Sequence, residues 1–208
     1  MFDARLRRII DPPLDRLGSR LAGLGIAANT ITVCGFALGV GAWLALALQS
    51  YWLALLLIAA NRLADGLDGA VARHSRTTDL GGYLDIVLDF LFYAGVPLFF
   101  AVGQPEVLLP AAFLIFSFVG TGVTFLAFAI LAAKRGVTTE VRGHKSFYYL
   151  GGLTEGTETI ALFVLICLFP SAFAWFAWIF AALCWLTAGV RIASAVETFR
   201  DEPTDRTT

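Results

Sequence analysis

Most of this chain lies in apolar runs that reach about 20 residues, the length at which a helix crosses the hydrocarbon core of a bilayer. Hydrophobic residues make up 58% of the 208 residues, and the mean hydropathy is +0.77. A chain this apolar is unlike an ordinary soluble domain. No long polar linker interrupts the runs, so the sequence predicts one compact membrane domain.

Six membrane spans follow an amphipathic N-terminal stretch in the expected fold, which is an all-α membrane protein. We place the spans at Asn29–Leu48, Tyr51–Ala72, Gly82–Val102, Val107–Ala133, Glu158–Phe169 and Ala172–Val196. The fifth run is short by its apolar count, and we expect its helix to begin earlier, near Gly151. The expected parts are an amphipathic juxtamembrane segment (1–28), a six-helix transmembrane domain (29–198) and a polar cytoplasmic tail (199–208).

The first 26 residues have the pattern of an amphipathic helix rather than of a span. Leucines and isoleucines recur every three or four residues, and five arginines lie between them. Pro12-Pro13 is expected to split the segment into a short arm and a second helix. The favoured interpretation is a helix that lies against anionic headgroups. The alternative is a helix packed on the cytoplasmic face of the protein itself.

The first span carries a pattern of small residues, Gly35-x-x-x-Gly39, followed by Gly41. Small side chains at this spacing let a second helix approach closely. Close packing within the chain is the favoured interpretation, and dimerisation through this face is the alternative.

The basic residues predict the orientation of the spans. With the N-terminus inside, all 15 lysine and arginine residues fall in inner segments or near the inner ends of spans, and the outer connectors carry none. This is the asymmetry of the positive-inside rule. The basic residues follow this topology and form no groove with interleaved aromatics, so the sequence gives no indication of nucleic-acid binding.

Four aspartates stand at the inner ends of the second and third spans. Asp65 and Asp68 are three residues apart, and Asp85 and Asp89 are four apart, so each pair shares one face of a helix. Carboxylates are costly at membrane depth and usually face a cavity, a partner or an ion. Hard cations such as Mg²⁺ suit oxygen ligands and often share them with phosphates. Ion pairs with nearby arginines, Arg62 among them, are the structural alternative.

The aspartates belong to a longer pattern. It reads Asp65-x-x-Asp68-Gly69-x-x-Ala72-Arg73, then seven residues, then Gly81-x-x-x-Asp85-x-x-x-Asp89. The small residues would let a bulky ligand approach the helix, and Arg73 offers a planar cation suited to a phosphate or a carboxylate. Asp79 lies off the pattern, where a helix cap or a solvated residue is expected.

This pattern resembles the signature of the CDP-alcohol phosphatidyltransferases, and the expected fold resembles that family in outline. The resemblance implies transfer of a phosphatidyl group from a CDP-linked lipid, such as CDP-diacylglycerol, to a small alcohol with release of CMP. It implies two Mg²⁺ or Mn²⁺ ions bound by Asp65, Asp68, Asp85 and Asp89, with Asp89 also the catalytic base. It implies a nucleotide pocket lined by Gly69, Ala72, Arg73 and Gly81.

The family resemblance also implies a homodimer embedded in membrane lipids. It places the chain in the bacterial inner (plasma) membrane. The distribution of the basic residues places the carboxylates, and with them the expected active site, at the cytoplasmic face. Which alcohol is the acceptor stays open. Whether the donor or the acceptor carries the lipid also stays open, because a CDP-amino-alcohol donor with a diacylglycerol acceptor uses the same chemistry.

Basic residues in the loop Lys134–Lys145, and one late in the sixth span, are candidate acceptor ligands. They are Arg135, Arg142, Lys145 and Arg191, which would bind a phosphate on the acceptor. The alternative for the loop is ordinary positive-inside charge. Glu155 and Glu158 stand at the start of the fifth span, where acidic side chains complement a helix N-terminus. They could also line the acceptor pocket.

Two other classes of membrane protein fit parts of the pattern. Intramembrane prenyltransferases also use aspartate-rich helices to hold Mg²⁺ and a pyrophosphate, but their motifs lack the glycine, alanine and arginine positions seen here. An ion-binding transporter could carry carboxylates in its core. Such a protein is expected to place them near the bilayer midplane, whereas here they cluster at one end of the spans.

Overall fold

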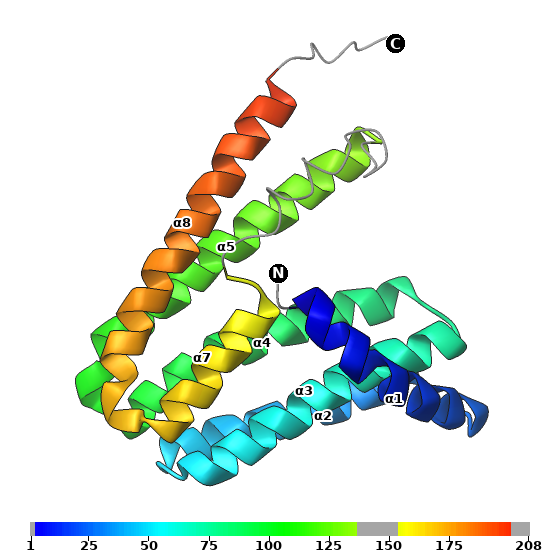
Figure 1. Ribbon diagram of the computed structural model, residues 1–208, viewed down its shortest axis with the longest axis horizontal. Helices are drawn as coiled ribbons and strands as arrows, with labels where there is room; N and C mark the ends of the chain where they lie inside the picture. The colour runs from blue at the N-terminus through cyan, green and yellow to red at the C-terminus, as the bar shows by residue number, and fades with distance from the viewer. Residues whose placement is uncertain (1–2, 137–153, 201–208) are drawn as a thin grey trace.

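Helices account for all the regular structure in the computed structural model, which describes residues 3–136 and 154–200 (Figure 1). The elements are α1 (Asp3–Gly23), α2 (Ala28–Ala47), α3 (Tyr51–His74), α4 (Asp79–Gly103), η1 (Pro105–Val107), α5 (Leu108–Lys134), α7 (Gly156–Leu168), η2 (Pro170–Ala172) and α8 (Phe173–Phe199). No strand occurs within those two stretches. The expected all-α class is therefore confirmed.

Four segments are long and apolar enough to cross a membrane. They are Ala28–Ala47, Asp79–Gly103, Pro105–Lys134 and Pro170–Phe199. Helix α3 has the length, but Arg62, Asp65 and Asp68 interrupt its second half. Helix α7 has 13 described residues, a rise of about 20 Å against a hydrocarbon core of about 30 Å. The described residues thus contain four candidate spans by length and composition, and the expected count of six is not confirmed.

The outer surface of these helices is strongly apolar. Trp52 is 73% exposed, Leu109 70% and Trp175 75%. In water such a surface would be costly, because it would leave large apolar areas uncovered. Lipid chains cover it at no such cost, so the exterior agrees with an integral membrane protein.

Two groups of helices make up the molecule. Helix α2 packs against both α3 and α4, and α1 packs across the far end of α3, at the right of Figure 1. Helices α5 and α8 pack together as the second group, and contacts between α4 and α5 join the two groups. Helix α7 packs against both α3 and α8. One end of the first group therefore holds helix α1, the turn between α3 and α4, and the N-terminus of α4.

Aromatic side chains fill the core where the two groups meet. The ring of Phe100 stacks on that of Phe173, with centroids 4.1 Å apart, and Phe92 meets Phe163 edge-on. All four of these side chains are at most 1% exposed. Aromatic pairs of this kind add to the burial of apolar area, and they hold α7 and α8 against α4.

The small residues of α2 serve packing within the chain, as the sequence favoured. A Cβ atom added at Gly35 would lie 2.8 Å from the Cβ of Ala64, and one at Gly39 would lie 2.7 Å from the Phe92 ring. Neither position has room for a side chain. Helix α2 therefore approaches α3 and α4 closely enough to contribute backbone to the site described below.

Helix α1 is continuous across Pro12 and Pro13, so the expected split at this dipeptide is wrong. Both prolines are exposed, and water can therefore satisfy the carbonyl groups that their missing N–H groups leave open. Beyond them, Leu14 packs on Gly66 and Gly18 packs on the Ala70 backbone of α3. This packing against α3 keeps α1 continuous beyond the two prolines. It corresponds to the alternative interpretation, in which the N-terminal segment packs on the protein itself.

Candidate active site

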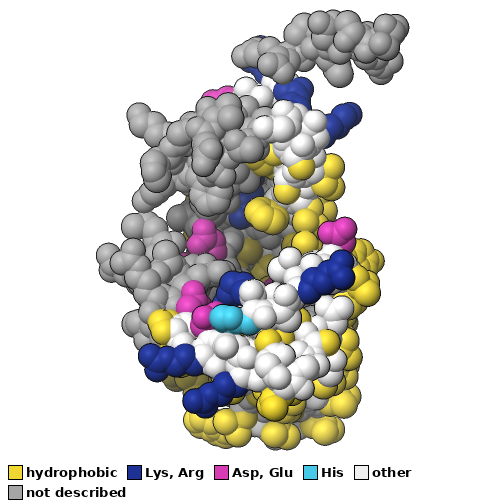
Figure 2. All heavy atoms as spheres, turned by 90° about the vertical axis from the view of Figure 1, so that its right-hand side faces the viewer, with side chains coloured by type: hydrophobic (Ala, Val, Ile, Leu, Met, Phe, Trp, Pro, Cys, Tyr) yellow, Lys and Arg dark blue, Asp and Glu magenta, His cyan; other side chains and the backbone are white. Residues whose placement is uncertain are grey.

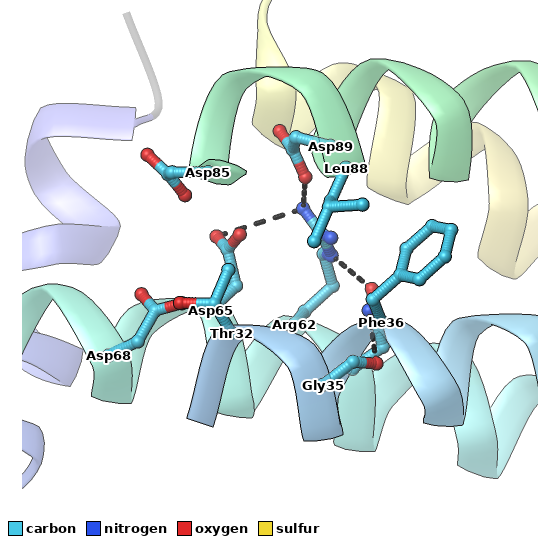
Figure 3. Close-up of a pocket in the computed structure, with 10 residues that line it drawn as sticks. Thr32, Gly35, Phe36, Arg62, Asp65, Asp68, Asp85, Leu88 and Asp89 are labelled. Atoms are coloured by element: carbon cyan, nitrogen blue, oxygen red, sulfur yellow. Dashed lines mark hydrogen bonds and ion pairs between the residues drawn. The ribbon is translucent and has the colours of Figure 1, made fainter. Parts of the chain in front are cut away.

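The four motif aspartates line a single pocket. Asp65 and Asp68 come from the last turns of α3, and Asp85 and Asp89 come from the first turns of α4 (Figure 3). The chain reverses between these helices at Ser75–Thr78, so residues just before and just after the turn lie at the same end. Two carboxylate pairs that are separate in sequence therefore face one volume.

Helix α2 forms the third wall of this pocket. The complete lining is Thr32, Gly35, Phe36, Asn61, Arg62, Asp65, Asp68, Asp85, Leu88 and Asp89. The Thr32 hydroxyl donates to the Ala28 carbonyl at 3.1 Å. Because α2 packs against both α3 and α4, it fixes the spacing of the two helices that carry the aspartates.

Arg62 is the cation of the pocket. Its Nη1 lies 2.6 Å from Oδ1 of Asp89 and 3.7 Å from Oδ2 of Asp65. Nη1 also donates to the Tyr93 hydroxyl at 3.1 Å. The ion-pair alternative considered for the aspartates is therefore realised for Asp65 and Asp89. Asp68 and Asp85 lie outside these two ion pairs of Arg62.

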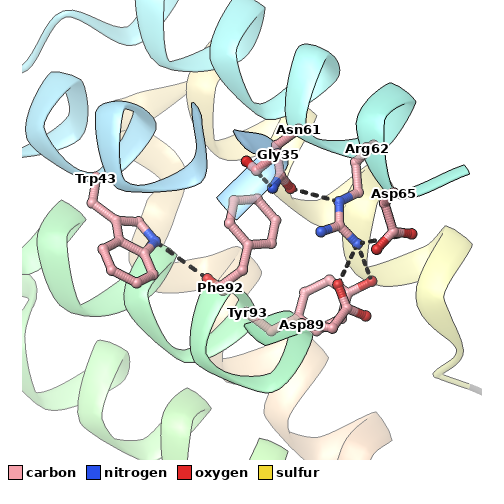
Figure 4. A network of polar contacts seen from close by, with 8 residues as sticks. All are labelled: Gly35, Trp43, Asn61, Arg62, Asp65, Asp89, Phe92 and Tyr93. Carbon is pink, nitrogen blue, oxygen red and sulfur yellow. Dashed lines mark hydrogen bonds and ion pairs between the residues drawn. The ribbon is translucent and has the colours of Figure 1, made fainter. Parts of the chain in front are cut away.

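A buried amide links this cation to α2. The Nε of Arg62 donates to Oδ1 of Asn61 at 2.8 Å, and Nδ2 of Asn61 donates to the Gly35 carbonyl at 2.8 Å (Figure 4). Asn61 is only 4% exposed. The connected contacts run from the α2 backbone through Asn61 and Arg62 to Asp89, so three helices hold the guanidinium in place.

Asp68 supplies an observation that fits a cation. Its side chain is 6% exposed, and its Oδ2 is buried without a hydrogen-bond partner. A buried carboxylate oxygen without a partner is costly, and a hard divalent cation is the ligand that such an oxygen favours. As the side chains lie, no three acidic, histidine or cysteine residues of the described chain are grouped as metal ligands. Arg62 already engages Asp65 and Asp89.

The other motif residues lie beside the pocket rather than in its lining. Gly69, Ala72 and Arg73 follow Asp68 on α3, and Nη2 of Arg73 lies 3.6 Å from Oδ1 of Asp15 in α1. Little stands over Gly69, where an added Cβ would meet only Nη1 of Arg73, at 3.6 Å. This part of α3 therefore keeps an open surface, as the sequence pattern indicated.

Gly81 lies where α4 begins, close to the start of α2. A Cβ atom there would lie 2.9 Å from Oδ1 of Asn29. The Gly81 N–H donates to the Thr78 hydroxyl at 3.0 Å, so Thr78 is the helix cap and Asp79 is an exposed residue of the first turn. Charged side chains gather at this end of the molecule (Figure 2).

The structure describes two of the four candidate acceptor residues. Arg191 is 9% exposed and donates from Nη1 to the Thr121 carbonyl at 3.0 Å, between α8 and α5. Arg135 follows α5, with its guanidinium carbon 5.1 Å from the centroid of the Phe199 ring. Arg142 and Lys145 lie outside the described residues. Neither Arg135 nor Arg191 lines the carboxylate pocket.

The acidic pair at the start of α7 caps that helix. Glu155 is the N-cap residue, and its backbone N–H donates to Oε2 of Glu158 at 3.1 Å in a capping box. This confirms the expected complement to a helix N-terminus.

Sequence reasoning missed the polar support of the site. Asn61 was not singled out, and Arg62 was considered only as a structural ion-pair partner. One signal was present, since this adjacent polar pair ends the apolar run Tyr51–Ala60 one turn before Asp65. The contributions of Thr32, Gly35 and Phe36 had no comparable signal, because they depend on how α2 packs.

Comparisons with known proteins identify a family. The family model described as CDP-alcohol phosphatidyltransferase matches residues 25–190. The chain is 55% identical over 201 residues to "Inner membrane protein YnjF" of Escherichia coli, covering 96% of this chain and 98% of the relative. It is 36% identical over 101 residues to an archaetidylinositol phosphate synthase of Pyrococcus horikoshii, covering 48% of this chain and 54% of that protein.

A solved structure has a similar fold. The crystal structure of Mycobacterium tuberculosis phosphatidylinositol phosphate synthase (PgsA1) with CDP-DAG bound matches with a TM-score of 0.65. The match covers 94% of this chain and 98% of that chain at 19% sequence identity. At this identity the likeness concerns the fold.

Proposed function

The chain belongs to the CDP-alcohol phosphatidyltransferase family, and on that premise we propose that it transfers a phosphatidyl group from CDP-diacylglycerol to an alcohol and releases CMP. The observation that carries the proposal is the meeting of four motif aspartates from α3 and α4 in one pocket. Such a cluster has a use in a reaction whose donor carries a pyrophosphate, because a cation can bridge the two sets of negative charge.

We propose that the aspartates hold divalent cations, Mg²⁺ or Mn²⁺, two ions in all. Asp65, Asp68 and Asp85 are the proposed ligands, with Asp89 contributing. The unpartnered Oδ2 of Asp68 and the all-oxygen donor set support this assignment. Bound there, the cations would neutralise charge on the donor pyrophosphate and on the departing CMP.

The chain's own groups would orient the donor and move the proton. Gly69, Ala72, Arg73 and Gly81 are proposed to line the nucleotide pocket, where the small residues admit the ligand and Arg73 faces its phosphates. Asp89 is the proposed base. It takes the proton from the acceptor hydroxyl as that oxygen attacks the lipid-side phosphorus, and the bond from this phosphorus to the CMP oxygen breaks. Positioning and charge neutralisation are the main demands of such a transfer.

For the acceptor we propose an alcohol that itself carries a phosphate. Arg135, Arg142, Lys145 and Arg191 are the proposed ligands of that phosphate. The names of two similar proteins, an archaetidylinositol phosphate synthase and a phosphatidylinositol phosphate synthase, support this class of acceptor. The identity of the alcohol is the first thing to measure.

The proposed topology has six spans, with the N-terminus and the carboxylate pocket on the cytoplasmic side of a bacterial inner membrane. The distribution of the 15 lysine and arginine residues supports it, as does the name of the inner-membrane relative. Under this proposal α3 crosses as a span with its charged end inside. The expected start of the fifth span near Gly151 lies outside the described residues. The homodimer also stays a prediction.

The test is CMP release by the purified protein with Mg²⁺ and CDP-diacylglycerol. The acceptor panel contains glycerol 3-phosphate, inositol phosphate, inositol, serine and glycerol. CMP release that depends on a phosphorylated member would support both the reaction and the basic acceptor ligands. Release with inositol, serine or glycerol alone would keep the reaction and reject the phosphate-binding role.

If folded protein releases no CMP with any acceptor of the panel, a second set of donors is tested. CDP-choline or CDP-ethanolamine with diacylglycerol would test the reaction with the lipid on the acceptor. A prenyl diphosphate donor would test the prenyltransferase alternative. Metal-dependent ion flux without any CMP would favour a transporter and overturn the proposal.

A further inference from the structure

Arg62 places a permanent positive charge among the carboxylates. Its Nη1 contacts Oδ1 of Asp89 at 2.6 Å and lies 3.7 Å from Oδ2 of Asp65. An arginine side chain stays protonated in proteins, so this charge cannot be removed by a change of pH. Both carboxylates are also proposed cation ligands. A divalent cation and Arg62 would therefore need the same oxygen atoms.

The remaining contacts of Arg62 are with neutral groups. Its Nε donates to Oδ1 of Asn61 at 2.8 Å, and Nη1 donates to the Tyr93 hydroxyl at 3.1 Å. The guanidinium carbon lies 4.5 Å from the centroid of the Phe92 ring and 5.2 Å from that of Tyr93. Aromatic faces attract a guanidinium. These groups can hold Arg62 after its carboxylate partners have turned to another cation.

Arg62 is also confined to this position. Its side chain is 16% exposed, and Asn61 is itself fastened to the Gly35 carbonyl of α2. Withdrawal into water would break these contacts and bare the Phe92 ring. The guanidinium therefore stays in the pocket whichever partners it has.

We propose that Arg62 is a resident counter-cation that binds Asp89 and Asp65 when no divalent cation is present and is held by Asn61, Tyr93 and Phe92 alone when those carboxylates bind one. The inference rests on the metal dependence proposed above. In the cation-free protein Arg62 would limit repulsion among the aspartates, and throughout it would weaken cation binding. It is a positioning residue, since it acts through the carboxylates.

The exchange predicts effects of opposite sign for two changes at contacting residues. Arg62→Gln removes a positive charge from beside the cation, so divalent binding should become tighter. Tyr93→Phe removes a neutral partner of Arg62, so the guanidinium should favour the carboxylates more and divalent binding should become weaker. A purely structural role would make both variants bind the cation less well.

The experiment measures Mn²⁺ binding to the full-length protein in detergent micelles, without donor or acceptor. Electron paramagnetic resonance of the free ion gives the dissociation constant without any turnover. We expect Arg62→Gln to bind at least about tenfold more tightly than wild type. Tyr93→Phe should bind more weakly by about threefold, the loss of roughly one neutral hydrogen bond. The melting temperature of Arg62→Gln in EDTA should fall and recover with Mn²⁺.

Arg200→Gln is the charge-matched control. Arg200 is exposed at the C-terminal end of α8 and does not line the carboxylate pocket. Removing its positive charge should therefore leave the Mn²⁺ dissociation constant unchanged.

The outcomes separate the inference from the proposed function. Wild-type protein that fails to bind Mn²⁺ would overturn the metal dependence itself. Binding by wild type with an equal or weaker affinity in Arg62→Gln would overturn the exchange alone. If Arg62→Gln does not fold, Tyr93→Phe decides, because tighter or unchanged binding there contradicts the exchange. Arg62→Lys keeps the charge and should not reach the tenfold tightening.

Discussion

The Nε2 of His74, the last residue of α3, lies 3.0 Å from Oδ2 of Asp15 in α1. The other oxygen of Asp15 lies 3.6 Å from Nη2 of Arg73. Asp15 thus fastens α1 to the end of α3 that carries the arginine proposed to face the nucleotide. The side chains are 36–55% exposed, so solvent and salt screen the contact. The contribution of these contacts to the stability of the fold should therefore depend on pH and ionic strength.

The first prediction concerns the thermal stability of the protein at low pH. The pKa of Asp15 lies below its usual value of 3.8, because the hydrogen bond from His74, with the charges of His74 and Arg73, outweighs the desolvation of the carboxylate. A lowered folded-state pKa stabilises the fold above the unfolded pKa, and this contribution is lost as the pH falls through the folded-state pKa. Between about pH 6 and pH 3, the melting temperature of wild type should therefore fall more than that of Asp15→Asn.

Thermal unfolding in detergent at several pH values checks this. Added salt should shrink the difference between wild type and Asp15→Asn at about pH 6, since the contact is exposed. Parallel melting curves for the two proteins across the whole range would show that Asp15 contributes nothing through its charge.

The second prediction concerns the proposed base. Asp89→Asn keeps the shape of the side chain but cannot take the acceptor proton. We expect the rate of CMP release to fall by about 10²–10⁴-fold, the usual contribution of a general base, while CDP-diacylglycerol binding partly survives. Binding of the donor and CMP release are measured on the same preparation. Wild-type turnover in this variant would rule out Asp89 as the base.

The third prediction concerns metal removal. EDTA should abolish CMP release, and excess Mg²⁺ or Mn²⁺ should restore it, because the proposed ligands are the carboxylate oxygens of the four aspartates in the pocket. A melting curve in EDTA serves as the control that the protein stays folded. An undiminished rate in EDTA would mean that the aspartates do their work without a divalent cation.

The fourth prediction concerns the close packing of α1 against α3. A Cβ at Gly18 would lie 2.6 Å from the Cβ of Ala70 and 2.8 Å from the Ala70 carbonyl carbon. Since backbone cannot yield as a flexible side chain does, Gly18→Ala should lower the free energy of unfolding by about 1–3 kcal/mol. Denaturant unfolding in detergent measures the change.

Gly189→Ala provides the comparison, because nothing lies within 4 Å of a Cβ at Gly189 in α8. Alanine there should be neutral or stabilising by up to about 1 kcal/mol, as expected in a helix interior. Equal effects of the two alanines would mean that α1 does not sit tightly on α3.

The fifth prediction concerns Asn61. Asn61→Ala leaves the Gly35 carbonyl and the Nε of Arg62 without their partner in a buried site. Unsatisfied buried groups cost about 1–3 kcal/mol each, so the variant should melt at a lower temperature and release CMP more slowly. Thr124→Ala is the control, since that hydroxyl donates within its own helix α5, to the Gly120 and Thr121 carbonyls. Wild-type stability in Asn61→Ala would contradict the role of Asn61 as the link between α2 and Arg62.

Much of the site could be predicted because its parts are local. The spacings of Asp65 with Asp68 and of Asp85 with Asp89 place each pair on one helix face, and a short turn brings the two helix ends together. The partners of these aspartates were harder to predict. Arg62 contacts Asp89, which lies 27 residues away in the chain. The sequence shows that an arginine is present, but it does not predict which of several carboxylates this arginine contacts.

The sequence by itself determined the all-helical class, the apolar exterior and the four carboxylates at one end of the helices. Each follows from short-range rules: the length of an apolar run, the 3.6-residue turn and the cost of charge in lipid. Tertiary structure alone decided that α1 runs unbroken through Pro12 and Pro13, that Gly35 offers its carbonyl to Asn61, and that Arg62 lies between Asp65 and Asp89. These outcomes depend on close packing between distant segments, and that packing overrides local preference.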